Sequence, residues 1–94
     1  MEMAQVFYFP SMLIKWHLAE VMAKYRIQTK ELAAKTGIQP SSISNLKSKE
    51  VMPKIDGHRL GAIVSALNAC LEDHNNPCRI TVTDLISWDD NDAA

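Results

Sequence analysis

The apolar spacing between residues 28 and 48 is the feature that most limits how this chain can fold. Leu32 falls in one short helical segment, and Ile43 and Leu46 fall in a second, three residues apart so that both face the same core. Gly37 lies between the two segments, where a chain leaving a helix passes through a left-handed conformation that glycine adopts without strain. The spacing predicts two short helices that cross at a tight turn.

Neighbouring residues set the ends of these two helices. Gln28 or Thr29 can begin the first helix, and Glu31 in its first turn suits the positive end of the helix dipole. Ala33 is small enough for the second helix to cross close by. Pro40 fits the first position of the second helix, because the N–H that it lacks is not needed there. We interpret residues 28–48 as a helix–turn–helix, a unit usually used to lay its second helix in the DNA major groove.

The second helix of this unit has an outward face that is polar and uncharged. Asn45 is its most informative residue, because an amide can bond adenine through N6 and N7, and Gln39 can do the same. Serines bond bases or phosphates with little discrimination, and an ordinary solvated helix face would have a similar composition. Within a helix–turn–helix we expect base contacts from this face. The residues expected to contact bases are Gln39, Ser41, Ser42 and Asn45, and Ser44 is expected at a phosphate.

The charges of the chain divide sharply along the sequence. The net charge is −1, but residues 15–59 carry nine basic and four acidic residues, whereas residues 60–94 carry one basic and six acidic residues. A basic front and an acidic rear would orient the molecule towards phosphate, although ordinary surface charge can also divide in this way. The loop after the second helix is the place where a backbone phosphate would lie. Its lysines, Lys47, Lys49 and Lys54, are expected to contact phosphate.

Length and composition predict one small domain. Ninety-four residues, 47% of them hydrophobic, suffice for one modest core. No stretch approaches the ~20 apolar residues of a membrane span, and the N-terminus lacks the pattern of a signal peptide. We therefore expect a cytoplasmic protein without membrane contact. The expected division is an N-terminal extension at 1–10, a DNA-binding domain at 11–88 and a flexible acidic tail at 89–94.

Further elements are expected on both sides of the helix–turn–helix. An earlier helix is predicted from Ser11 to about Tyr25, and a later helix, capped by Asp56, is predicted to weaken after Asn68. The alternation over residues 79–83 predicts a strand, after which Thr83 would cap a short helix over 84–88.

A second strand is predicted near the N-terminus, over residues 6–9, which are β-branched or aromatic and end at Pro10. It could pair with residues 79–83 as a small antiparallel sheet, within one chain or between two chains. Two strands alone are marginal, so they would need the core or a partner behind them. An apolar strand pair beside Trp88 is where a dimer interface would be expected.

With these elements in place, the chain resembles the Cro/repressor (Xre) type of helix–turn–helix transcriptional regulators, over about residues 12–88. The matching segments include Ile14-Lys15-Trp16-His17-Leu18, Glu31-Leu32-Ala33, Thr36-Gly37-Ile38, Ser42-Ile43-Ser44, Ala66-Leu67-Asn68 and Thr83-Asp84-Leu85-Ile86. The resemblance implies a mainly α, five-helix repressor-like domain that binds palindromic or near-palindromic DNA as a dimer. It also implies phosphate contacts at Gln28, Thr29 and Lys30.

The chain departs from the family pattern at the start of the second helix of the unit. That position often carries Arg, Lys or Gln, whereas Pro40 occupies it here and cannot donate a hydrogen bond. Base readout then falls on fewer residues.

Other chemistry is poorly supported by the residues. Cys70, His74 and Cys78 are spaced by four, but structural zinc usually requires four ligands and closer cysteine pairs, so no metal or other cofactor is expected. A disulfide between the two cysteines is not expected in a reducing cytoplasm, and Cys70 is expected to be a buried apolar residue. No phosphate-binding glycine loop, nucleophile elbow or carboxylate pair is present, so no enzyme is expected.

The sequence predicts a sequence-specific, DNA-binding transcriptional regulator that acts as a homodimer on double-stranded DNA. A repressor acting by promoter occlusion is favoured, because the sequence shows no separate effector or activation domain. Two alternatives remain open: the antitoxin of a toxin–antitoxin pair, and a helix–turn–helix that serves as a protein-interaction scaffold without DNA. Steep loss of affinity with salt would distinguish a DNA reader from a scaffold.

Overall fold

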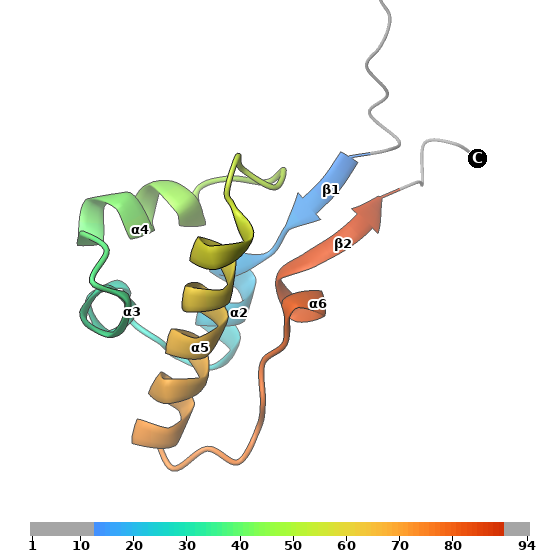
Figure 1. Ribbon diagram of the computed structural model, residues 1–94. Coiled ribbons are helices and arrows are strands. Elements are labelled where there is room, and N and C mark those ends of the chain that lie inside the picture. Colours follow the sequence, from blue (N-terminus) through green and yellow to red (C-terminus); the bar gives the residue numbers. More distant parts are fainter. Residues whose placement is uncertain (1–12, 90–94) are drawn as a thin grey trace, which may run out of the picture.

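The computed structural model describes residues 13–89, which form five helices and one two-stranded antiparallel sheet (Figure 1). The prediction of a mainly helical, five-helix domain with a short β element is confirmed. The elements are β1 (Leu13–Trp16), α2 (Leu18–Lys24), α3 (Thr29–Thr36), α4 (Pro40–Lys47), α5 (Gly57–Asp73), α6 (Val82–Leu85) and β2 (Ile86–Asp89).

Helix α5, the longest of the described helices, supports two of the others. It begins at the predicted cap, where Oδ1 of Asp56 accepts a hydrogen bond from the N–H of Arg59 at 2.7 Å. Helices α3 and α6 both contact α5, and α3 also packs against α4 (Figure 1). The predicted weakening after Asn68 is wrong, because α5 continues to Asp73 and buries Cys70 and Leu71, one turn beyond Ala66 and Leu67.

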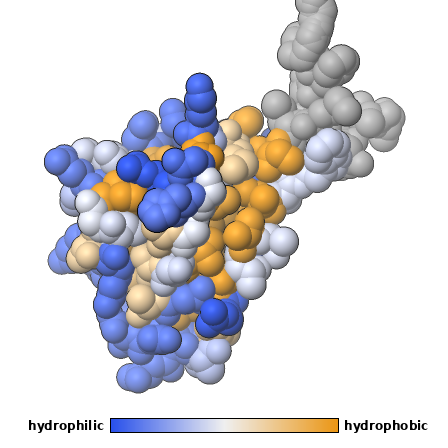
Figure 2. All heavy atoms as spheres, viewed as in Figure 1, coloured by the Kyte–Doolittle hydropathy of each residue, from blue (hydrophilic) through white to orange (hydrophobic). Residues whose placement is uncertain are grey.

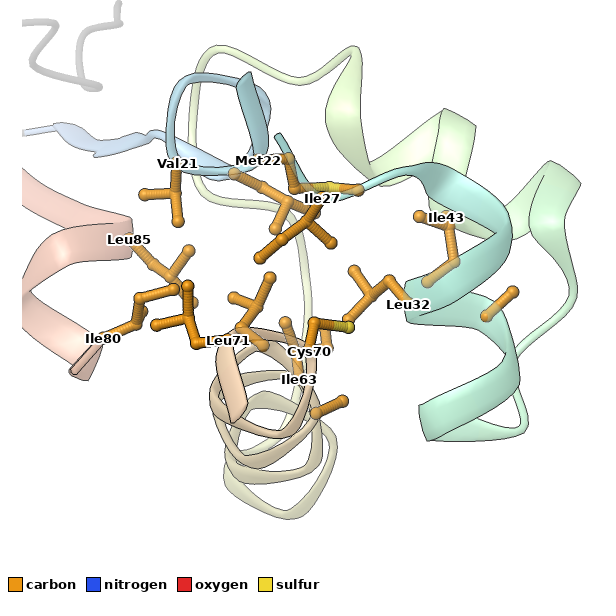
Figure 3. Close-up of a cluster of buried hydrophobic side chains, with 14 of the residues drawn as sticks. Val21, Met22, Ile27, Leu32, Ile43, Ile63, Cys70, Leu71, Ile80 and Leu85 are labelled. Carbon is orange, nitrogen blue, oxygen red and sulfur yellow. The ribbon is translucent and has the colours of Figure 1, made fainter. Parts of the chain in front are cut away.

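The core lies where the helices converge, with side chains from α2, α3, α4, α5 and the α6 region meeting at one centre (Figure 3). Within the described part of the chain every buried side chain is hydrophobic, and the expected burial of Cys70 is confirmed. Hydrophobic burial of this kind is the main favourable contribution to folding. The largest fully buried side chains are those of Leu18, Met22, Leu32, Ile43, Ile63, Leu67, Leu71, Ile80, Leu85 and Cys70.

The predicted helix from Ser11 is wrong over its first turns. Residues 13–16 form strand β1, and the helix begins only at Leu18, after His17. The N–H of Trp16 donates to the carbonyl of Glu50 at 2.9 Å, and the N–H of Met52 donates to the carbonyl of Ile14 at 2.8 Å. Long-range pairing therefore decides the conformation of a segment that also fits a helical pattern.

The predicted strand at 79–83 and the predicted helix at 84–88 are also wrong. The chain enters helix α6 at Val82 and then forms strand β2 from Ile86, so the order of strand and helix is reversed. Thr81, and not Thr83, is the cap: its N–H donates to Oδ2 of Asp84 at 2.8 Å. Asp84 is the third residue after Thr81, which is the spacing of a capping box.

The sheet joins the two ends of the described chain. Strand β1 pairs with β2 in the register Leu13↔Asp89, Ile14↔Trp88, Lys15↔Ser87 and Trp16↔Ile86. Together the strands form a ribbon that projects from the helices (Figure 1). The predicted sheet thus exists, but residues 13–16 and 86–89 form it; the predicted strand at 6–9 and residues 90–94 of the predicted tail lie outside the described residues.

Two glycines that both have room for a side chain allow a direct test of the backbone conformation in the turn between α3 and α4. Gly37 has φ +78°, and a Cβ added there or at Gly61 in α5 would meet nothing within 4 Å. We expect Gly37→Ala to lower the free energy of unfolding by about 1 kcal/mol, because alanine is strained in the left-handed region. We expect Gly61→Ala to raise it by about 0.5–1 kcal/mol, because glycine weakens a helix interior. Urea denaturation measures the free energy of unfolding of both variants. Changes of the same sign in the two variants would contradict the left-handed conformation of Gly37.

Candidate nucleic-acid interface

The turn between α3 and α4 is fixed by backbone and side-chain hydrogen bonds. The N–H of Gly37, in the left-handed region, donates to the carbonyl of Ala33 at 2.8 Å. Oγ1 of Thr36 donates to the carbonyl of Leu32 at 2.9 Å and accepts from the N–H of Ile38 at 3.1 Å. The hydroxyl therefore uses both its donor and its acceptor to close the last turn of α3. Gly37 has the conformation that the sequence predicted for it.

Helix α4 presents one face to the core and one to solvent. Pro40 begins the helix, Ile43 is fully buried, and Leu46 packs against the core from a half-buried position. The opposite face consists of exposed polar residues whose side chains make no hydrogen bond with any other residue in the range 13–89, so their donors and acceptors are available to a ligand. These residues are Gln39, Ser41, Ser42, Ser44 and Asn45.

The C-terminal end of α4 is held by strand β1. Trp16 is 3% exposed, and its indole Nε1–H donates to the carbonyl of Leu46 at 3.0 Å. This carbonyl belongs to the last turn of α4, and it also accepts a hydrogen bond from the N–H of Lys49 at 3.3 Å. No spacing pattern along the chain could predict this contact, because it joins residues thirty positions apart.

The predicted phosphate-contacting lysines differ in their environments. Lys30, Lys49 and Lys54 are exposed, and no ion pair or hydrogen bond of their side chains is seen with another described residue. Lys47 is half-buried, and its Nζ donates to Oγ1 of Thr29 at 3.2 Å. This bond brings the end of α4 and the start of α3 together, so Lys47 and Thr29 act as one pair.

A groove of about 700 Å³ runs beside this end of α4, between the sheet, the start of α2 and residues 47–50. It brings Lys15 and His17 next to Lys47 and Lys49, and none of the predictions assigned Lys15 or His17 to the site. Only the pairing of β1 with β2 and with the 50–52 segment places them there. The groove also contains the carboxylates of Glu20 and Glu50, so its charge is mixed.

His17 links two elements along the groove. Its Nδ1 lies 2.7 Å from Oε1 of Glu20, and its Nε2 lies 2.7 Å from Oγ of Ser87. The imidazole therefore joins the first turn of α2 to strand β2. This arrangement makes His17 a structural bridge between the helices and the sheet.

Helix α3 is tied to the C-terminal end of α5 by an ion pair and a hydrogen bond. Nζ of Lys35 lies 2.7 Å from Oδ2 of Asp73, and Nε2 of His74 lies 2.7 Å from Oε2 of Glu31. The N–H of Gln28 donates to Oε1 of Glu31 at 3.0 Å. The hydrogen bond from Gln28, followed by that from His74, holds the pKa of Glu31 below its ordinary value.

The cysteines do not form a metal site with their neighbours. Cys70 is buried, and burial raises the pKa of its thiol, whereas Cys78 is exposed; both are free thiols. Among residues 13–89, no group of three or more His, Cys, Asp or Glu side chains is arranged to hold a metal ion.

Residues 17–73 match the family model of the Cro/C1-type HTH DNA-binding domain. The chain belongs to this family. The family assignment agrees with the resemblance seen in the sequence, and it makes the chain a DNA-binding regulator in general terms. No curated protein and no solved structure matched the chain.

The Cro/C1-type match spans helices α2 to α5 and leaves out β1, α6 and β2. The sheet is therefore an addition to the part that defines the family. No helix among residues 13–89 is both long and apolar enough to cross a membrane.

The contacts of Glu31 predict how the stability of this Cro/C1-type domain depends on pH. Because the folded state lowers the pKa of Glu31 from 4.5, its carboxylate stabilises the fold above about pH 4.5. That stabilisation is lost as the pH falls through the folded-state pKa. We expect Glu31→Gln to unfold at lower urea concentration than the native protein at pH 7, and the difference to shrink below pH 4.5.

Glu72→Gln is the matched control, because Glu72 is exposed on α5 and no contact of its carboxylate is seen with another described residue. Its effect should be small at both pH values. If the difference in unfolding urea concentration between Glu31→Gln and the native protein is the same at both pH values, the role given to the Glu31 carboxylate is contradicted.

Proposed function

We propose that this protein is a sequence-specific transcriptional repressor that binds a palindromic operator as a homodimer, with α4 in the major groove. The observation that carries the proposal is the exposed face of α4, whose polar side chains have no partners within residues 13–89. A surface of unpaired amides and hydroxyls suits the base edges of the major groove, which present donors and acceptors in a distinct pattern for each base pair.

Asn45 and Gln39 carry most of the base discrimination in this proposal. Both side chains are exposed amides, one in the second half of α4 and one at its N-cap. An amide can make a bidentate pair with adenine, whereas Ser41 and Ser42 add base contacts of lower selectivity.

Phosphate contacts fix the register of the protein on the duplex. The start of α3 supplies Gln28, Thr29 and Lys30, and Ser44 lies on α4. Lys47 contributes through its pair with Thr29, and Lys49 and Lys54 follow in the exposed segment after α4. Such contacts provide affinity with little sequence information.

Repression by occlusion is consistent with this arrangement. It needs only a protein that occupies a promoter, and the helix–turn–helix with its flanking lysines suffices for that. A helix–turn–helix used purely as a protein scaffold would show no duplex binding even at low salt, so the same binding experiment distinguishes the two functions.

Substitution of Asn45 tests direct base readout. A preferred duplex is first selected from a randomised pool, and binding is then followed by fluorescence anisotropy on that duplex and on a scrambled one. We expect Asn45→Ala to weaken binding to the selected duplex by about 1–3 kcal/mol and to leave the scrambled duplex almost unaffected. Ser65→Ala, at an exposed position on α5, should leave both affinities unchanged. Equal loss on both duplexes would exclude Asn45 from base readout.

Substitution of Lys49 tests the phosphate contacts. We expect Lys49→Ala to weaken binding to all duplexes alike and to reduce the slope of log affinity against log salt by about 1. Arg79→Ala removes the same charge from an exposed residue after α5, outside the helix–turn–helix, and should leave the slope unchanged. If both variants change the slope equally, the effect comes from net charge and Lys49 does not contact a phosphate.

A further inference from the structure

Strand β2 has an edge that no described residue covers. The opposite edge of the sheet is protected, because the carbonyl of Glu50 and the N–H of Met52 bond the backbone of β1. Pairing with β1 uses the backbone of Ser87, so the N–H and carbonyl of Trp88 and the carbonyl of Ile86 point outward. Within residues 13–89 these outward groups bond no other backbone group. Unpaired strand edges of this kind are templates for another strand.

Hydrophobic side chains gather along the same ribbon. Trp88 is 57% exposed, and it stands opposite Ile14 on the face of the sheet that also carries Trp16 and Ile86. In Figure 2 a hydrophobic surface runs from the sheet alongside α5, whereas the surface around α3 and α4 is mostly hydrophilic. An indole this exposed beside an open edge is a feature expected at an interface.

We propose that the open edge of β2 pairs with the β2 edge of a second copy of this chain, which creates a continuous four-stranded antiparallel sheet. The inference rests on the proposed function, which it deepens by naming the surface that makes the dimer. The twofold axis passes between the two copies of Ser87. Each Trp88 N–H then donates to the Ile86 carbonyl of the other copy, which gives two equivalent hydrogen bonds.

The sequence of β2 is self-complementary in this register. Trp88 of each copy lies opposite Ile86 of the other, so apolar rows extend across all four strands, from Ile14 through Trp88 to Ile86 and Trp16 of the second copy. Two strands are marginal alone, whereas the four-stranded sheet has the number of strands and the apolar face that stable sheets need.

The geometry also places the DNA-facing groups of both copies on one side. The twofold axis of an antiparallel pair is perpendicular to the sheet, so the face that carries Lys15 and Ser87 points the same way in both copies. That face borders the groove lined by Lys47 and Lys49. Two sets of phosphate-contacting lysines are thus directed towards one duplex, as a palindromic site requires.

Disulfide trapping tests the register directly. In the proposed pair, the two Ser87 residues form a non-hydrogen-bonded pair with Cα atoms about 4.5 Å apart, which is within the range for a disulfide. Ser87→Cys is made in a Cys78→Ser background, because Cys78 is exposed, whereas Cys70 is buried. We expect mild oxidation to convert most of this variant to a covalent dimer. The control, Ser65→Cys in the same background, should remain monomeric on a non-reducing gel, because Ser65 is exposed on α5 and belongs to neither strand.

A proline at the edge provides a second readout. Trp88→Pro removes the outward N–H and leaves the Lys15–Ser87 pairing of β1 with β2 in place. We expect analytical ultracentrifugation to show a dimer for the native protein and a folded monomer for Trp88→Pro. A native protein that sediments as a monomer, a Trp88→Pro variant that remains a dimer, or Ser87→Cys that cross-links no more than Ser65→Cys would overturn the inference.

Binding measurements separate this inference from the function on which it rests. A covalent Ser87→Cys dimer that binds no duplex at low salt would contradict the DNA-reading function and leave the interface standing. A native protein that is a monomer and binds a selected duplex with a steep salt dependence would contradict the interface and support the DNA-reading function.

Discussion

The position of the sheet relative to the helices depends on the contacts of Trp16. Its indole lies in strand β1, is almost completely buried, and donates its N–H to the carbonyl of Leu46 at the end of α4. A buried indole N–H needs an acceptor, and the Leu46 carbonyl, which also accepts a hydrogen bond from the N–H of Lys49, supplies it. The backbone N–H of the same residue bonds Glu50 in the segment that follows α4. One residue therefore sets both where the sheet lies and how α4 ends.

A second anchor fixes the segment between α5 and α6, which leads the chain back to the sheet. The side-chain amide of Asn68 in α5 donates to the carbonyl of Ile80 and accepts from its N–H, both at 2.8 Å. The segment before α6 pairs with no neighbouring strand, so the side chain of Asn68 supplies the hydrogen bonds that a strand would otherwise make to the backbone of Ile80. Burial of Ile80 against the core follows, and the chain then reaches Thr81 in position to begin α6 and β2. The alternating pattern at 79–83 reflects this anchoring and not a strand.

The sequence is most informative where the structure is local. Gly37, Pro40 and Asp56 each determine conformation within a few residues, and their predicted positions at the turn and helix starts are confirmed. The sheet could not be located in this way, because β1 and β2 are about seventy residues apart and each segment also fits a helical or loop pattern alone. Lys15 and His17 join the groove only through that pairing, so no spacing rule could have found them. The base and phosphate contacts remain predictions, since they concern a partner molecule.

The charge of the protein is better understood from its contacts than from its total. Near α3, Lys35 forms an ion pair with Asp73 of α5, and Glu31 is hydrogen-bonded to His74, so both side chains are engaged within the fold. The lysines at 30, 49 and 54 have no such partner among the described residues. A chain with a net charge of −1 can therefore present a positive surface on one side, because residues 15–59 carry nine basic and only four acidic residues, and most of the acids come later in the sequence. Since exposed charges are screened within about 10 Å at ordinary salt, this local distribution and not the net charge governs approach to a phosphate backbone.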